Sequence, residues 1–156
     1  MKLVPNLLDR LFGSDTAHRK GEDYLLSPEQ ARASVATDIE ALLNTRCGHK
    51  EEVFADFPLA RRSVVNFGIP DFSSMSISSG LDRDKLCASI TQSIEQQDRR
   101  LRLVSVALDG EQERLGKLRF LITAVLTMSG LSQPVSFSAE LDQHARRYVV
   151  GRGINR

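Results

Sequence analysis

The spacing of hydrophobic residues divides the chain into a helical part and a strand part. Between residues 28 and 97, apolar side chains recur mostly every three or four positions, whereas between residues 103 and 141 they recur every second position. The first period is typical of amphipathic helices and the second of strands with one buried face. Because the helices precede the strands, the pattern predicts an α+β fold.

The first long helix has a strong start signal. Ser27 can cap the free amides, Pro28 suits the first helical position, and Gln30 stands three residues after the cap, as a capping box requires. We expect this helix to run to about Arg46, where a cation complements the helix dipole, before Gly48 ends it. Its predicted apolar face comprises Ala31, Val35, Ile39, Leu42 and Leu43.

A second helix is predicted from about Asp82 to Gln97, with Asp82 as a possible cap and Leu86, Ile90 and Ile94 on one face. The two helices are joined by an irregular, phenylalanine-rich connection from residue 49 to residue 80. Its proline and glycine residues favour a packed loop with a short helix near residues 59–66.

Three period-two segments predict strands, separated by turns near residues 109–116 and 129–134. We expect an antiparallel meander of three strands, or slightly more, with the helices on one face. The buried faces are predicted to be Val104, Val106 and Leu108; then Leu118, Phe120, Ile122, Ala124, Leu126 and Met128; then Val135, Phe137, Ala139 and Leu141.

The third strand is expected at an edge of the sheet, with a short piece at residues 148–150 added after it. An exposed edge offers unpaired amides and carbonyls to another chain. Arg146 and Arg147 either blunt this edge with charge or flank a strand that a partner pairs with by strand addition. The sequence leaves both readings open.

The chain is expected to form one main domain. Residues 23–150 make the α+β domain, residues 151–156 a tail, and residues 1–22 a short helix, at about positions 3–12, with a linker. That short helix is only about three turns long and marginal alone. It either packs on its own domain or docks in a partner's groove.

Charge and composition narrow the function classes. Lys and Arg (21) nearly cancel Asp and Glu (20), so no net field attracts nucleic acid. The sequence shows no run of about 18 apolar residues, so we expect no membrane span, and no signal peptide is visible. Two cysteines are too few for a disulfide framework, which favours the cytoplasm.

Candidate catalytic chemistry is sparse. The three histidines, His18, His49 and His144, lack metal-ligand spacing, and no phosphate-binding glycine motif occurs, so no metal or cofactor is expected. Cys47 and His49 are near enough in sequence to act as nucleophile and base. No oxyanion motif accompanies them, and a helix C-terminus would raise the thiol pKa, so we interpret Cys47 as structural.

The most distinctive charged segment is Asp98-Arg99-Arg100, where the second helix passes into the first strand. A rigid, charged junction suits docking better than catalysis. Arg100 can form a bidentate pair with a partner's carboxylate, while Asp98 can hold Arg100 in place or accept hydrogen bonds from partner amides. A solvated helix end is the alternative reading.

Several segments together resemble a known family. Residues 38–46, 61–71 and 90–106, with residues 7–11, are similar to TssE, the small wedge subunit of the type VI secretion baseplate, itself related to the lysozyme-like wedge protein of contractile phage tails. The resemblance implies a non-enzymatic adaptor, present in multiple copies in a cytoplasmic baseplate near the inner membrane. Other wedge subunits and the contractile sheath would be its partners.

The resemblance also assigns contact residues. The family's Glu-Pro-Arg triplet, which attaches to the wedge core bundle, falls on Asp98, Arg99 and Arg100, with Arg99 replacing the proline. The meander resembles the interlocking domain of sheath subunits, which implies a strand edge that seeds sheath assembly. Phe137 and Val149 lie in this predicted pairing region.

Two rival functions remain at the level of sequence. The lysozyme-like label of the phage relatives suggests a peptidoglycan hydrolase using an acid such as Glu95 or Asp98. A soluble adaptor in an unrelated complex is the other. The sequence shows no catalytic pair and no export signal, so we favour the baseplate adaptor over the hydrolase.

Overall fold

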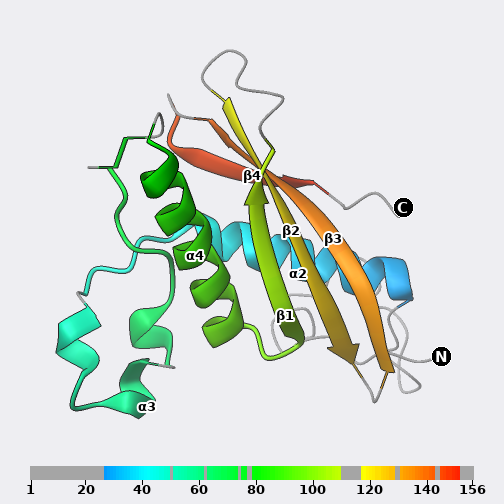
Figure 1. Ribbon diagram of the computed structural model, residues 1–156. Helices are drawn as coiled ribbons and strands as arrows, with labels where there is room; N and C mark the ends of the chain where they lie inside the picture. Colours follow the sequence, from blue (N-terminus) through cyan, green and yellow to red (C-terminus); the bar gives the residue numbers. More distant parts are fainter. Residues whose placement is uncertain are drawn as a thin grey trace.

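The computed structural model has two long helices packed against a four-stranded antiparallel sheet, which confirms the α+β class (Figure 1). The predicted N-terminal helix, its linker and residues 152–156 lie outside the described residues. Within the described part, no helix is both long and apolar enough to cross a membrane. The structure describes residues 27–49, 51–61, 63–73, 75–76, 79–109, 117–128, 131–142 and 145–151.

Helix α2 (Pro28–Asn44) begins where the capping signals predicted. The Ser27 hydroxyl accepts from the Gln30 amide at 3.2 Å, and the Gln30 side chain accepts from the Ser27 amide at 2.8 Å. The helix ends two residues before Arg46, because Thr45 is extended. Arg46 still serves the helix end, since its Nη1 donates to the Leu43 carbonyl at 2.9 Å.

Helix α4 (Gly80–Gln97) begins earlier than predicted, and its cap is Ser79 instead of Asp82. The Ser79 hydroxyl accepts from the Asp82 amide at 3.4 Å, so Ser79 has the capping role that we had predicted for Asp82. Asp82 instead lies in the first turn, where its charge complements the dipole, and accepts from the Ser76 amide. Leu86, Ile90 and Ile94 are buried, as predicted.

The connection between the helices folds as three short turns: η1 (Glu51–Phe54), α3 (Pro58–Arg61) and η2 (Val64–Asn66). The single helix predicted near residues 59–66 is therefore interrupted. Ser63 divides it, because its hydroxyl donates to the Ala60 carbonyl and accepts from the Val65 amide. These turns project away from the sheet (Figure 1).

The connection comes back to the end of α2 at Gly68, a position where the backbone conformation and the close packing require glycine. Gly68 has φ 117°, and a Cβ there would lie 2.6 Å from the Thr45 carbonyl oxygen. This close approach lets the Ile69 amide donate to Thr45 and the Cys47 amide donate to Ile69. The connection is thereby bonded to the end of α2.

The sheet is β1 (Leu101–Leu108), β2 (Lys117–Met128), β3 (Leu131–Asp142) and β4 (Arg147–Gly151), in that order. The predicted meander therefore gains a fourth strand at the position we had expected. Residues 147–151 of β4 pair with residues 138–142 of β3. Consequently β4 covers the second half of β3, and β3 is an edge only in its first half.

The core lies between the sheet and the helices, with α2 crossing behind the strands and α4 beside β1 (Figure 1). The predicted faces of β2 and β3 are buried apart from Met128, which is half-buried. Tyr148 of β4 is fully buried, and its ring lies against those of Phe72 and Phe120. The largest core side chains are Tyr148, Phe120, Phe137, Ile39, Leu43, Ile69, Ile90, Ile94, Leu118, Ile122 and Leu126.

Candidate docking site at the junction of α4 and β1

The junction between α4 and β1 is a tight turn held by backbone hydrogen bonds. Asp98 caps the helix, with its amide donating to Ile94 at 2.9 Å, and the Leu101 amide donates back to Asp98 at 3.2 Å. The Arg100 carbonyl accepts from Thr127 of β2 at 2.7 Å, which starts the sheet. The positions of Arg99 and Arg100 are thus fixed by the fold.

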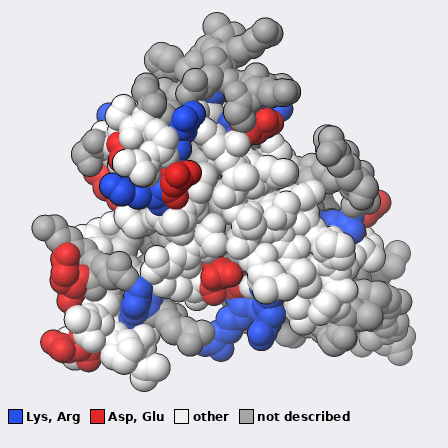
Figure 2. All heavy atoms as spheres, in the orientation of Figure 1, with Lys and Arg blue, Asp and Glu red and all other residues white. Residues whose placement is uncertain are grey.

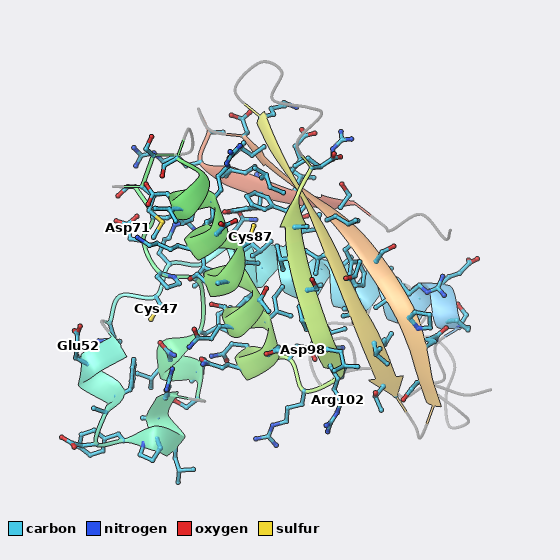
Figure 3. All side chains as sticks on the ribbon, in the orientation of Figure 1. Cys47, Glu52, Asp71, Cys87, Asp98 and Arg102 are labelled. Atoms are coloured by element: carbon cyan, nitrogen blue, oxygen red, sulfur yellow. The ribbon has the colours of Figure 1, made fainter. Side chains whose placement is uncertain are left out.

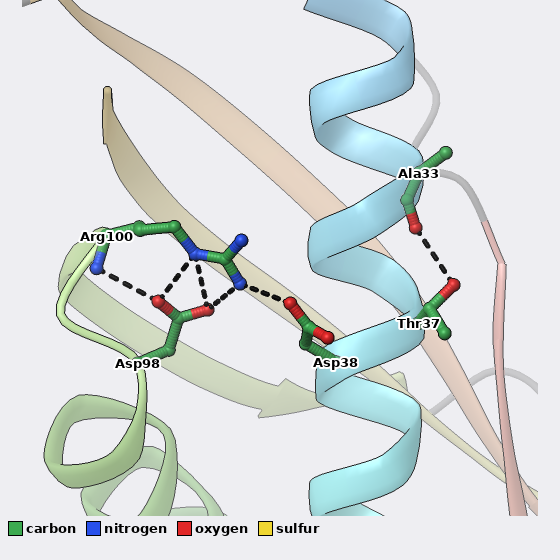
Figure 4. A network of polar contacts seen from close by, with 5 residues as sticks. All are labelled: Ala33, Thr37, Asp38, Asp98 and Arg100. Atoms are coloured by element: carbon green, nitrogen blue, oxygen red, sulfur yellow. Dashed lines mark hydrogen bonds and ion pairs between the residues drawn. The ribbon is translucent and has the colours of Figure 1, made fainter. Parts of the chain in front are cut away.

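Arg100 forms an ion-pair network inside the protein (Figure 4). Its Nε and Nη2 donate to the two carboxylate oxygens of Asp98 at 2.9 and 2.6 Å, and Nη2 also donates to Asp38 of α2. Burial acts to lower the pKa of Arg100, but the hydrogen bonds and charges of Asp98 and Asp38 outweigh it and raise the pKa above its usual value. Arg100 is therefore a fixed cation.

This network shows which role Asp98 has within the folded chain. Its carboxylate accepts from the Arg100 amide and from the Arg100 guanidinium, so it holds Arg100 in place. Asp38 of α2 completes the network by accepting from Arg100. The Arg100 and Asp98 side chains are only 24% and 14% exposed. Together these residues attach α2 to the junction.

Arg99 and Arg102 differ from Arg100, because both are exposed. Within the described part of the chain neither forms an ion pair. Arg102 projects from the start of β1 away from the body, while Asp98 is turned inward (Figure 3). Basic side chains gather at this end of β1 (Figure 2). The exposed positive charge of the junction is thus carried by Arg99 and Arg102.

A β-bulge follows directly in β1. Arg102 pairs with Val125 and Ser105 with Thr123, so Leu103 and Val104 together oppose the single residue Ala124. Leu103 has φ 52° and its side chain is 80% exposed. A shallow groove beside it is lined by Glu95, Arg99, Arg102 and Thr127 among others. The sequence pattern had not revealed this bulge.

The outer edge of β4 is closed by helix α2. Asn44 donates from Nδ2 to the Tyr148 carbonyl at 2.9 Å and accepts from the Tyr148 amide at 2.8 Å, while Glu40 accepts from the Val150 amide at 3.0 Å. The backbone groups that would bind an added strand here are already occupied. A partner strand at residues 148–150 would have to displace both side chains.

The two predicted sheath-contact residues have different surroundings. The Val149 side chain is 56% exposed on β4, whereas the Phe137 side chain is 1% exposed in the core. The Tyr148 backbone bonds to Asn44 and not to β3, so the backbone groups of Leu141, which lies opposite Tyr148, point towards β2. Phe137 is four residues before Leu141, so its backbone groups point towards β2 as well. Phe137 is therefore a core residue that stabilises the sheet, and its role in pairing stays a prediction.

The opposite edge of the sheet, along β1, is more open. The Asp109 amide donates to Arg119 of β2, so alternation directs the backbone groups of Val106 away from β2. An open groove separates this edge from α4 and is lined by Asp84, Cys87, Thr91, Val104 and Val106 among others. A chain lying in this groove could pair with β1.

Among the described residues, the candidates for catalysis considered above form no arrangement suited to turnover. The Cys47 thiol donates to Asn66 Oδ1 at 2.9 Å, and the His49 ring packs edge-on against Phe54. Asp98 is ion-paired and Glu95 is exposed. Among the residues described by the structure, no group of His, Cys, Asp or Glu could hold a metal ion. His18 and His144 lie outside that part.

Comparison with known proteins gives two findings. A family model described as "Baseplate wedge protein gp25" matches residues 29–130, which include α4, β1 and the junction. A chain in the solved structure of "The baseplate complex from the type VI secretion system" is similar in fold, with a TM-score of 0.50 and 18% identity, covering 78% of this chain and 95% of that one. No curated protein matches the sequence.

Proposed function

The chain belongs to the baseplate wedge protein gp25 family, and on that premise we propose that it is a non-enzymatic adaptor of a type VI secretion baseplate wedge. The family match through the junction carries this proposal. The similar fold of a chain from a type VI secretion baseplate supports the choice of machine. Its place would be the cytoplasmic baseplate near the inner membrane, in multiple copies.

The contact with the wedge core bundle is proposed at the Asp98-Arg99-Arg100 junction. The three residues have different roles: Arg100 is bonded to Asp98 and to Asp38, whereas Arg99 is exposed between Asp98 and Arg100. The buried pair keeps the turn in one geometry, so that Arg99 is presented without a large cost in conformational entropy on binding. Arg99 is thus the residue that reaches the partner.

The second proposed contact is a strand edge for the contractile sheath. Because Asn44 and Glu40 occupy the outer edge of β4, the edge of β1 is better suited. An extended sheath segment in the groove beside α4 could bond to the backbone of Val106. Val149 would remain available to contact a sheath subunit through its exposed side chain.

The hydrolase alternative receives less support from the site. A glycosidase needs one carboxylic acid with a raised pKa and a second carboxylate across a cleft. Asp98 is occupied by Arg100, and Glu95 is an exposed residue of an open groove. The junction therefore suits recognition better than bond cleavage.

The proposal is tested by a pull-down with the other wedge subunits. Arg99→Glu reverses the exposed charge, and Arg147→Glu makes the same change at an exposed position on β4. We expect binding by the wild type and by Arg147→Glu, and weak binding by Arg99→Glu, with circular dichroism showing that all three are folded. Absence of binding by the wild type would refute the wedge assignment; equal binding by Arg99→Glu would move the contact elsewhere.

A further inference from the structure

Leu103 combines two features that are costly in a soluble domain. It is a large apolar residue that is 80% exposed. Its backbone has φ 52°, in a region that residues other than Gly, Asn and Asp rarely adopt. The surface near it is not apolar in general, because Arg99 and Arg102 flank it. A strained position that persists at an exposed site suggests a role in binding.

The fold requires the bulge but not the leucine. Leu101 and Val104 are both buried although they are three residues apart, which a regular strand cannot achieve. The extra residue in β1 resets the alternation after Arg102, so that Val104 enters the core and Leu103 turns outward. Asn or Gly would accept this backbone with less strain.

The surroundings of Leu103 define the partner's chemistry. Arg99 and Arg102 are exposed, carry positive charge and form no ion pair within the described residues. Glu95 is the acidic group in the adjoining groove. An exposed apolar side chain that shares a groove with two exposed guanidinium groups, neither of them ion-paired among the described residues, complements an apolar hollow whose rim carries carboxylates.

We propose that Leu103 is the apolar anchor of the contact with the wedge core bundle, inserting into a hollow of another wedge subunit while Arg99 and Arg102 pair with carboxylates at its rim. This inference rests on the proposed function and extends the same contact from Arg100 to Leu103, three residues further along the chain. The surface is continuous, because Arg99, Arg102 and Leu103 line one groove. Arg100 contributes by holding the turn.

The test compares Leu103→Asn with Leu81→Asn in the full-length protein. Leu81 lies at the start of α4 and is 75% exposed, so the control makes the same chemical change at a similar exposure. The probe is the complex of the other wedge subunits, purified without this protein, and affinity is measured by titration calorimetry. We expect Leu103→Asn to bind at least tenfold more weakly, and Leu81→Asn to bind like the wild type.

A thermal melt separates this role from a structural one. If Leu103 serves binding, the melting temperature of Leu103→Asn equals or exceeds that of the wild type, because asparagine tolerates the bulge geometry better. Equal affinity of Leu103→Asn and the wild type, or a clearly lower melting temperature, overturns the inference and leaves the wedge assignment intact. Absence of binding by the wild type overturns both.

Discussion

Two neighbouring parts of the junction are built in opposite ways. Around Arg100, the polar contacts lie within the chain: the guanidinium bonds to Asp98 and Asp38, and the Arg100 and Asp98 side chains are mostly buried. Around Leu103, two exposed arginines lack a partner among the described residues, a leucine faces solvent, and the backbone is strained. The first part stabilises the fold, and the second is the part that we propose contacts a partner.

The same contrast recurs at the two edges of the sheet. On β4, Asn44 and Glu40 of α2 occupy the outward backbone groups of Tyr148 and Val150. On β1, the outward groups of Val106 face an open groove beside α4. One edge is thus protected against strand addition, as is usual in soluble sheets, and the other is accessible.

The largest predicted effect is the loss of Arg100. Arg100→Ala leaves the Asp98 carboxylate, 14% exposed, without its cation, and detaches α2 from the junction. We expect a loss of about 2–3 kcal/mol in the free energy of unfolding, below the cost for a fully buried pair because solvent screens part of the network. Urea denaturation measures it. Arg99→Ala is the control, with a change below about 0.5 kcal/mol; similar losses for both would erase the contrast.

The next effect concerns the closed edge. Asn44→Ala removes both hydrogen bonds to the backbone of Tyr148, a residue that is fully buried. Leaving an amide and a carbonyl unpaired there should lower the free energy of unfolding by about 2 kcal/mol. Hydrogen exchange of the Tyr148 amide gives a local measurement. Unchanged protection in the variant would mean that Asn44 does not close this edge.

Leu103→Gly should act in the reverse direction to the two changes above. Glycine adopts the positive φ of the bulge without a Cβ clash, although it also raises the entropy of the unfolded chain. We expect the free energy of unfolding to stay unchanged or to rise by up to about 1 kcal/mol. Thermal and urea melts measure this, and a loss above 1 kcal/mol would show that Leu103 packs as a structural residue.

The smallest effect is a pH dependence at the surface pair of Lys117 and Glu140. The hydrogen bond from Lys117, followed by its charge and that of Arg119, outweighs desolvation and lowers the pKa of Glu140. A carboxyl with a lowered pKa in the folded state stabilises the protein above its unfolded pKa, and this contribution is lost as pH falls through the folded value. The small advantage of the wild type over Glu140→Gln at pH 7 should therefore disappear towards pH 3. A difference that grows on acidification would contradict it.

Local signals made much of the fold predictable. Ser27, Pro28 and Gln30 act within one turn, so the start of α2 could be inferred from their order alone. The period of two identified the buried faces of β2 and β3 because both strands are regular. The start of α4 was misassigned, since Ser79 and Asp82 are both good caps and sequence does not rank them.

The parts that escaped prediction depend on long-range contacts. Asp38 and Arg100 are 62 positions apart, and Asn44 is 104 positions from Tyr148, so no local pattern links them. The bulge was hidden because the predicted strand began at Leu103 with Val104 on its buried face, so the pattern took no account of Leu101, which is also buried three positions before Val104. The passage from helix to strand at residues 98–100 was predicted, but the different surroundings of Arg99 and Arg100 were not.

If Leu103 is the apolar anchor, its side of the junction faces another wedge subunit in the assembled baseplate. The most direct measurement is site-specific photo-cross-linking in cells, with a photoreactive amino acid at position 103 or at position 81, and identification of the product by mass spectrometry. We expect a cross-link to another wedge subunit from position 103 and none from position 81. Cross-linking to that subunit from position 81 alone, or from neither position in assembled baseplates, would contradict it.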